Sequence, residues 1–341
     1  MRAAVFLGAG KPLSVQTVPD PAPAPDQVVL EVANAGICGS DLHVTQYPGL
    51  APSGVILGHE FSGTIAALGA GVKGGWKVGD RVTALPLNPC NSCEACDSRL
   101  PALCSHNLFT GNYLSAQGAY AQYVGARANM LQRLPDGVSF EEGALVEPLA
   151  VGHHVVDMAE LKPGASVLVI GAGPIGVAVT LFARAAGARH VIVSERAEGR
   201  RRLAVEVGAT ATIDPTVENV AEAFARHADG SRPQVVFECV GVPGMVRQAI
   251  ELVGLRGRVV VAGVVFEDDP IAPLAALAKE ITIRYSQAYT ERDFEAVIDA
   301  IATGKVKVRP IHTSTVSLDE LPEAFEALRR PGEQCKVLIR P

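Results

Sequence analysis

The chain has 341 residues, a length sufficient for two domains that each bury a core. Its apolar fraction of 48% and its 34 glycines are typical of a compact α/β protein and argue against disorder. The net charge of −6 argues against nucleic acid as the main partner. The N-terminus lacks a signal-peptide pattern, so we expect a cytoplasmic protein whose clustered cysteines bind metal rather than form disulfides.

Residues 1–152 are expected to form a mainly β domain, because short apolar segments alternate there with glycine and proline. Strands are predicted at residues 28–32, 61–67, 81–85 and 120–124. Residues 149–160 are predicted to form a linking helix, which Lys162-Pro163-Gly164 would end.

Residues 166–195 predict a strand, a glycine-rich turn, a helix and a second strand. Apolar residues 167–170 are followed by Gly171-Ala172-Gly173-Pro174-Ile175-Gly176, and a second apolar run at 191–193 ends at Glu195. Gly171 permits a tight turn, Gly173 lets a pyrophosphate approach the backbone, and Gly176 lets the helix pack on the strand. The first N–H groups of the helix favour bound phosphate. The segment therefore predicts a dinucleotide site.

No charged residue occurs from Pro163 to Ala183, a length that a membrane-spanning helix would also have. The glycines and the proline of the motif divide this stretch into a strand-sized and a helix-sized piece. A buried parallel strand with its helix is therefore favoured over a membrane span.

Further strands are predicted near residues 211–213, 235–239, 258–262 and 281–286, with a helical stretch at 218–228. Together with the first two strands, they predict a doubly wound Rossmann sheet of six parallel strands over residues 153–289, and hence an α/β fold. Residues 290–303 are predicted to form a helix, and residues 335–340 a strand that returns to the first domain. Residues 290–341 are therefore grouped with the first domain.

Four cysteines lie within fifteen residues, at Cys90, Cys93, Cys96 and Cys104. Four thiolates at this spacing can surround one tetrahedral zinc ion and close its coordination shell, as in a structural site. Unrelated buried cysteines or two disulfides are the alternative, which a reducing compartment disfavours.

A second set of metal-ligand residues is dispersed along the chain, at Cys38, His59, Glu60 and Glu147. One cysteine, one histidine and a carboxylate, with a position left for water or substrate, make up a catalytic zinc site. From spacing alone, packing roles for Cys38 and His59 are equally open.

Several motifs together resemble those of the zinc-dependent alcohol dehydrogenases of the medium-chain dehydrogenase/reductase superfamily, over essentially the whole chain. Besides the four-cysteine loop and the glycine-rich turn, these are residues 36–43 (GICGSDLH), 58–63 (GHEFSG), 77–82 (KVGDRV) and 147–150 (EPLA). The resemblance implies a GroES-like catalytic domain and a Rossmann domain, with the active site in the cleft between them. It also implies a homo-oligomer, with a tetramer favoured over a dimer.

The resemblance identifies Cys38 and His59 as ligands of a catalytic zinc and Glu60 as the third ligand. Glu147 matches either a further ligand or a carboxylate just beside the ligands. Asp41 would orient His59 by accepting its second N–H, or would instead only cap a turn.

Ser40 and His43 match a proton relay that in this family runs from a hydroxyl through the nicotinamide ribose to a histidine. Histidine suits this role because imidazole exchanges protons near neutral pH. The alternatives are a turn residue for Ser40 and an ordinary surface histidine for His43.

Cofactor choice is predicted from the end of the second strand, where Glu195 can bind both ribose hydroxyls of NAD and would repel the 2′-phosphate of NADP. Arg196 and Arg200 follow and can bind such a phosphate or form a solvated helix face, and NAD is favoured over NADP. The family pattern adds Cys239 and Val240 beside the adenosine, Gly263 and Val264 beside the nicotinamide, and Lys336 near the phosphates. Cys239 is equally interpreted as a core residue of its strand.

The substrate is predicted only as a class. Residues 58–60, 147–150 and 289–294 are similar to the polyol, 2,3-butanediol and threonine dehydrogenase branch, which favours a secondary alcohol or vicinal diol. Phe109, Tyr113 and Leu114 either form an apolar wall beside the substrate or pack on the cysteine loop. A zinc-independent quinone or enoyl reductase would lack the Cys38 and His59 motifs, and a non-catalytic NAD(P)-binding protein would be expected to have lost a ligand or a relay residue. A zinc- and NAD-dependent dehydrogenase is therefore favoured.

Overall fold

The computed structural model describes residues 1–330 and 332–341, which divide into two compact units. The first unit contains Met1–Glu147, Thr290–Thr303 and His312–Pro341, and the second contains Pro148–Tyr289 and Gly304–Ile311. Within these residues, no helix combines the length and the apolar character that a bilayer crossing requires.

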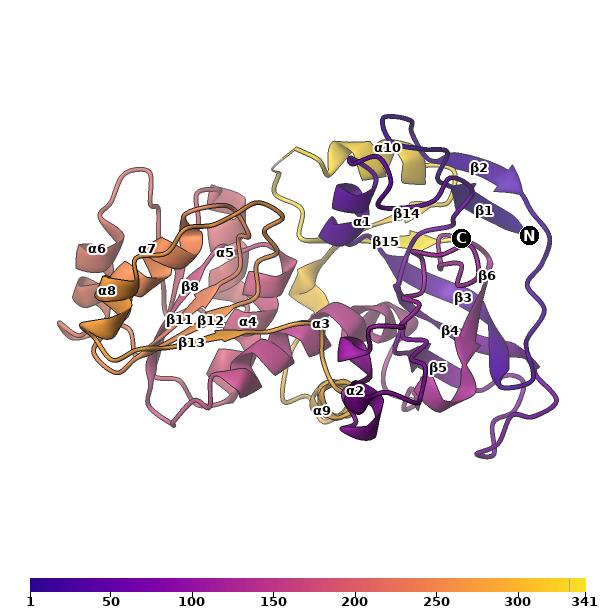
Figure 1. The fold of residues 1–341 in the computed structure, drawn as a ribbon, viewed down its shortest axis with the longest axis horizontal. Helices are drawn as coiled ribbons and strands as arrows, with labels where there is room; N and C mark the ends of the chain where they lie inside the picture. The colour runs from indigo at the N-terminus through magenta and orange to yellow at the C-terminus, as the bar shows by residue number, and fades with distance from the viewer. Residues whose placement is uncertain (331) are drawn as a thin grey trace. The chain divides into compact units, whose positions relative to one another are not determined.

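The second unit is built on a sheet of six parallel strands in the order β10-β9-β8-β11-β12-β13 (Figure 1). The strands are β8 (Ser166–Ile170), β9 (His190–Ser194), β10 (Ala211–Ile213), β11 (Val235–Glu238), β12 (Arg258–Val261) and β13 (Thr282–Tyr285). β8 is buried along its whole length, as expected for a central parallel strand covered on both faces. The strand order reverses between β8 and β11, where doubly wound sheets bind their ligands. The predicted six-stranded parallel sheet is confirmed.

The helices of the second unit are α4 (Pro174–Ala185), α5 (Glu198–Glu206), α6 (Val220–His227), α7 (Met245–Leu252) and α8 (Pro273–Leu277), with the short η3 (Arg309–Ile311). The linking helix α3 (Phe140–Met158) begins earlier than the predicted residue 149, so that Glu147 lies inside the helix. Pro148 is an interior residue of this helix, although proline usually ends or kinks a helix. The actual start carries a capping signal, since Ser139 and Glu142 bond reciprocally to each other's backbone N–H.

The first unit is built on a seven-stranded sheet in the order β14-β15-β3-β4-β5-β7, with β6 paired to β3 (Figure 1). Its strands are β3 (Gln27–Gly36), β4 (Glu60–Leu68), β5 (Arg81–Ala84), β6 (Tyr123–Arg127), β7 (Leu131–Arg133), β14 (His312–Ser317) and β15 (Lys336–Arg340), beside the hairpin β1 (Arg2–Val5) and β2 (Ser14–Thr17). Its helices are α1 (Gly39–Val44), α2 (Glu94–Asp97), η1 (Pro101–Leu103), η2 (Ala128–Met130), α9 (Glu291–Ala302) and α10 (Leu321–Ala327).

Two predicted strands of the first unit bear on the site. The tail strand is confirmed, because β15 pairs with β14 and with the end of β3. The strand predicted at 120–124 is shifted, since β6 begins at Tyr123. Tyr120 lies before it and donates its backbone N–H to the Leu57 carbonyl at 2.9 Å. The segment just before His59 is thereby tied to the segment around Tyr120.

Candidate metal centres and nucleotide site

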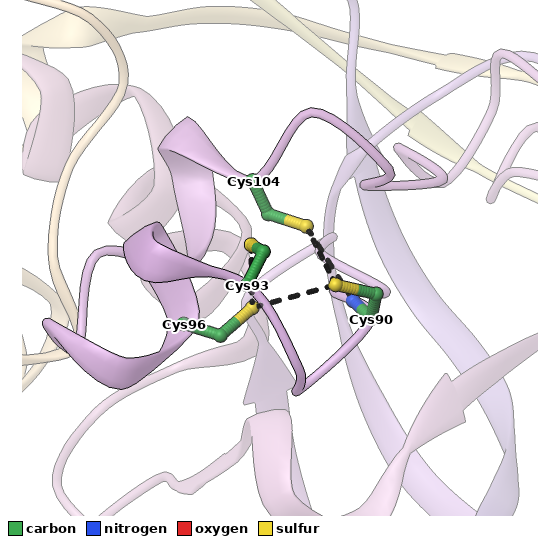
Figure 2. A group of neighbouring side chains, drawn as sticks. All are labelled: Cys90, Cys93, Cys96 and Cys104. Atoms are coloured by element: carbon green, nitrogen blue, oxygen red, sulfur yellow. Dashed lines mark hydrogen bonds between the residues drawn. The ribbon is translucent and has the colours of Figure 1, made fainter.

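The sulfur atoms of Cys90, Cys93, Cys96 and Cys104 converge on one point (Figure 2). The sulfur–sulfur distance is 3.5 Å for Cys93–Cys96 and for Cys90–Cys104, and 4.0 Å for Cys90–Cys96. A tetrahedral zinc with sulfur ligands at about 2.3 Å requires sulfurs about 3.8 Å apart. The four thiols are free of disulfides and fit one zinc ion with every coordination position filled.

Tight local turns bring these cysteines together. Cys93 is the N-cap of α2, Cys96 lies within this helix, and Cys104 directly follows η1. Hydrogen bonds from Ser92 lower the pKa of Cys90 to about 6, which favours its thiolate form. A thiolate is the form that binds zinc. The pKa of Cys93 is instead raised to about 11, because its thiol shares hydrogen bonds with the neighbouring cysteines.

The facing ends of β3 and β4 bring the second metal-ligand set together. Gly36, the last residue of β3, pairs with Glu60, the first of β4, while Cys38 is the N-cap of α1 and His59 precedes Glu60. The ligand atoms of Cys38, His59 and Glu60 lie within 4.8 Å of one another. A side chain at position 36 would displace the Glu60 carboxylate, because a Cβ there would lie 2.0 Å from Glu60 Oε2. A thiol, an imidazole and a carboxylate in this space fit a zinc ion with a fourth position open.

His59 faces a buried carboxylate. It is 3% exposed, and its Nδ1 lies 3.4 Å from Asp41 Oδ1. Burial lowers the pKa of His59, but the charges of Asp41 and Cys38 outweigh this and hold the pKa well above its usual value. Because Nδ1 faces Asp41, Nε2 is the nitrogen left for a metal ion. Asp41 therefore lies where an orienting carboxylate is needed, rather than only capping a turn.

Tyr120 is a further residue beside the site, and the sequence motifs do not indicate it. It is fully buried, and its hydroxyl donates a hydrogen bond to Asp41 Oδ2 at 2.5 Å. Burial and the Asp41 charge raise the pKa of Tyr120 well above its usual value, so the hydroxyl keeps the proton that it donates. Nothing in the local sequence around Tyr120 indicates a partner 79 residues away.

Lys336 lies beside the metal-ligand set and is 1% exposed. Its Nζ donates to Glu60 Oε1 at 2.6 Å, to Glu60 Oε2 at 2.8 Å and to the Ile37 carbonyl at 3.0 Å. Burial lowers the pKa of Lys336, but the negative charges of Glu60 and Cys38 raise it above its usual range. All three N–H donors are used, so the expected contact with a cofactor phosphate does not fit this placement.

Glu147 is buried within α3, in the same unit as the ligand set. Its charge contributes to the raised pKa of Lys336. Among the described residues, the cluster of converging ligand atoms contains Cys38, His59 and Glu60 but not Glu147. The geometry thus favours the carboxylate beside the ligands over the direct ligand for Glu147.

Ser40 and His43 lie on the same face of α1, since residues three apart on a helix are neighbours. The Ser40 hydroxyl donates to Cys38 Sγ at 3.3 Å, and both relay candidates are exposed. Phe109 packs edge-on against His59, with the two ring centroids 5.0 Å apart. A hydroxyl and an apolar ring thus flank the metal-ligand residues, while Tyr113 and Leu114 are exposed.

The glycine-rich turn of the second unit has the predicted form. Gly171 has φ +91°, and a Cβ on Gly176 would lie 2.0 Å from the Gly171 carbonyl oxygen. Gly173 is the N-cap of α4, and a Cβ on it would meet nothing within 4 Å. Pro174 is the first residue of the helix, and Ile175 follows in its first turn. The open space at Gly173 and the free N–H groups of the first turn fit a pyrophosphate.

Glu195 directly follows β9 and points back toward this turn. Its carboxylate accepts the backbone N–H of Ala172 and of Ala197, both at 2.8 Å. Arg196 is exposed, and the Nε of Arg200 is buried without a hydrogen-bond partner in the described structure. The negative charge is therefore fixed at the glycine turn, with two arginines just beyond it.

The remaining nucleotide candidates lie after β11 and β12, at the same end of the sheet. Gly171 approaches Val240, since a Cβ on the glycine would lie 2.7 Å from Val240 Cγ2. A Cβ on Gly263 would lie 2.3 Å from the Gly241 nitrogen, so the two loops touch. Val240 and Val264 are exposed, whereas Cys239 is half-buried. The structure thus brings these candidates together at the point where the strand order reverses.

Two family models match the chain: an alcohol dehydrogenase GroES-like domain over residues 24–136, and a zinc-binding dehydrogenase domain over residues 174–303. The chain belongs to the zinc-dependent alcohol dehydrogenases of the medium-chain dehydrogenase/reductase superfamily. The family, the fold class and the oxidoreductase reaction on alcohols that the sequence predicted are confirmed, and the zinc-independent and non-catalytic alternatives are not favoured.

Relatives of this alcohol dehydrogenase match it over nearly their whole length. It is 34% identical to sorbitol dehydrogenase of Halalkalibacterium halodurans, over 96% of this chain and 95% of the relative. The structure of 2R,3R-butanediol dehydrogenase from Bacillus subtilis matches with a TM-score of 0.91 and 32% identity, over 100% of this chain and 99% of that chain. The structure of a zinc-binding dehydrogenase from Sinorhizobium meliloti 1021 bound to NADP matches with a TM-score of 0.92 and 33% identity, over 100% of this chain and 99% of that chain.

Proposed function

We propose that this alcohol dehydrogenase transfers hydride reversibly between NAD and a secondary alcohol or vicinal diol, whose product is a ketone. The observation that carries the proposal is the convergence of Cys38, His59 and Glu60, with the Ser40 hydroxyl in contact with the cysteine. One catalytic and one structural zinc ion per subunit belong to this proposal.

Cys38, His59 and Glu60 would hold the catalytic zinc, and the four-cysteine loop the structural one. When bound, the zinc ion supplies a Lewis acid that acidifies an alcohol hydroxyl, and the nicotinamide supplies the hydride acceptor. Asp41 fixes the imidazole of His59. Both Glu60 oxygens accept hydrogen bonds from Lys336, so Glu60 would keep a charged partner whether or not it bound the metal ion.

The proton leaves by residues of α1. The exposed Ser40 hydroxyl takes the proton of the alcohol, and His43, one turn further along, exchanges it with water. Phe109 packs edge-on against His59 and would limit the access of water to that side of the ligand set.

The fixed carboxylate of Glu195 supports NAD, because it offers an acceptor to the ribose hydroxyls and repels a 2′-phosphate. NADP is the competing cofactor. The exposed Arg196 and the NADP-bound structure from Sinorhizobium meliloti support NADP. We give more weight to the carboxylate that two backbone N–H groups hold at the glycine turn than to the exposed Arg196, so NAD is favoured.

A secondary alcohol or vicinal diol is supported by the relatives, which include a sorbitol dehydrogenase and a 2R,3R-butanediol dehydrogenase. Initial rates of cofactor reduction with sorbitol, racemic 2,3-butanediol and ethanol, each with NAD and NADP, test the proposal. We expect turnover of the two diol-containing substrates with NAD and little with ethanol. Turnover of primary alcohols alone would contradict the proposed substrate class. Turnover with NADP alone would contradict the proposed cofactor.

A homo-oligomer, with a tetramer favoured over a dimer, is also proposed. In the described part of the chain, β13 pairs with β12 alone, which leaves one edge of the six-stranded sheet open. Tyr285 of this strand is 68% exposed, and Leu274 and Leu277 of α8 are 77% and 73% exposed. Such an apolar edge favours pairing with a second copy of the chain. Light scattering of the wild-type protein and of Tyr285→Asp tests the proposed oligomer. A wild-type protein that is monomeric would contradict the proposal.

A further inference from the structure

The Asp41 carboxylate bridges two buried residues. Its Oδ1 lies 3.4 Å from His59 Nδ1, and its Oδ2 accepts the Tyr120 hydroxyl at 2.5 Å. Asp41 is 1% exposed and Tyr120 is 0% exposed. Because water does not reach Oδ2, the tyrosine hydroxyl is the donor that fixes the rotation of the carboxylate.

The Tyr120 ring also contacts the backbone just before His59. Gly58 has φ +96°, and a Cβ on it would lie 2.4 Å from Tyr120 Cδ1. Backbone hydrogen bonds tie the two segments together, from the Ala119 N–H to the Gly58 carbonyl and from the Tyr120 N–H to the Leu57 carbonyl. Tyr120 thus restrains His59 in two ways: through Gly58, the residue just before His59, and through the carboxylate of Asp41.

Residues near the C-terminus contact both Tyr120 and the helix α1, which carries Asp41. Phe325 of α10 packs edge-on against Tyr120, with ring centroids 6.4 Å apart. Arg329 donates to the Leu42 carbonyl at 2.7 Å and to Thr45 Oγ1 at 2.8 Å. Since Leu42 and Thr45 lie at the end of α1, the helix that carries Asp41 is fixed by the same segment that supports the tyrosine.

We propose that Tyr120 is a positioning residue for the catalytic metal: its hydroxyl fixes Asp41, and Asp41 in turn keeps Nε2 of His59 directed at Cys38 and Glu60. The inference rests on the proposed catalytic zinc. Loss of the hydroxyl leaves Oδ2 of Asp41 without a donor, so the carboxylate and the imidazole reorient. The four-cysteine site lies on a separate loop and is unaffected.

Tyr120→Phe tests the proposal, because it removes the hydroxyl and keeps the ring on Gly58 and Phe325. The matched control is Tyr123→Phe, which removes a hydroxyl from half-buried β6 in the same unit. Zinc affinity is measured by competition with a chromophoric chelator, and ligand geometry by the visible spectrum of the cobalt-substituted protein. We expect about tenfold weaker binding at one zinc site and a shifted cobalt spectrum for Tyr120→Phe, with wild-type values for Tyr123→Phe.

A double-mutant cycle with Asp41→Asn separates a positioning role from a packing role. If Tyr120 acts through Asp41, Tyr120→Phe adds little to the loss of zinc affinity that Asp41→Asn already causes. Additive losses, or wild-type affinity and spectrum in Tyr120→Phe, would overturn the inference. A wild-type protein that binds zinc at the four-cysteine loop alone would instead overturn the proposed catalytic site.

Discussion

Lys336 and Glu60 form a buried ion pair although 276 residues separate them, with Nζ at 2.6 Å and 2.8 Å from the two carboxylate oxygens. Lys336 begins β15, Glu60 begins β4, and β3 lies between these strands in the sheet. The ion pair therefore lies across the end of β3, next to Cys38. The carboxylate proposed to bind zinc is thus also the counter-ion of a buried ammonium, so the loss of either partner leaves an uncompensated charge.

Replacement of the lysine is expected to destabilise the fold. Lys336→Met leaves the fully buried Glu60 without its cation, which costs about 3–5 kcal/mol of unfolding free energy. Urea unfolding of the metal-free protein measures this loss. The double variant with Glu60→Gln is the control and should recover much of the stability. An unchanged urea midpoint in the single variant would show that the pair contributes nothing.

Loss of one sulfur from the four-cysteine loop is expected to lower stability. Cys93→Ser or Cys104→Ser opens the closed coordination shell, so we expect a lower thermal midpoint and one metal ion fewer per subunit. Cys335→Ser is the matched control, because Cys335 is a buried cysteine outside both metal clusters. If Cys93→Ser kept the wild-type midpoint but lost turnover, the structural and catalytic roles of the two sites would have to be exchanged.

Cofactor preference is expected to depend on Glu195. Glu195→Ala removes the charge that the Ala172 and Ala197 N–H groups hold, so kcat/KM for NAD should fall at least about tenfold relative to NADP. Arg202→Ala is the control, since Arg202 is exposed and pairs with Glu198 on α5. Steady-state kinetics with both cofactors measure the ratio, and an unchanged ratio would remove Glu195 from the ribose site.

Acid is expected to weaken one ion pair of the second unit. The hydrogen bond from Arg284 to Glu160, at 2.7 Å, holds the pKa of Glu160 below its ordinary value of 4.5. A carboxyl group whose pKa is lower in the folded state than in the unfolded state stabilises the protein at pH values above its unfolded pKa. This contribution is lost as the pH falls through the folded pKa. Glu160→Gln should therefore lower the thermal midpoint at pH 7, with a difference that shrinks below about pH 4. A difference that is independent of pH would contradict this interpretation.

The sheet of the second unit was predictable because its signals are local. β8 is a run of buried β-branched and leucine residues, and Gly171 ends it with a turn that needs a positive φ. The linking helix begins before the predicted residue 149, because Pro148 is accommodated inside it and the capping pair of Ser139 and Glu142 marks its start.

The ligand set was predictable for a different reason. Spacing alone left packing roles for Cys38 and His59 equally open, and the resemblance of their motifs to the family indicated that they are ligands. The structure places the two motifs at the facing ends of neighbouring strands. The partners of those residues were not predictable, because Tyr120 and Lys336 reach Asp41 and Glu60 from 79 and 276 residues away. Local sequence carries no information about such pairs.

Metal content per subunit, measured in wild type and Cys38→Ser beside cofactor reduction with racemic 2,3-butanediol, tests the central claim most directly. We predict two zinc ions and turnover for wild type, and one zinc ion without turnover for Cys38→Ser. A Cys38→Ser protein that keeps both zinc ions and its turnover would contradict the assignment of Cys38, His59 and Glu60 as the catalytic metal centre.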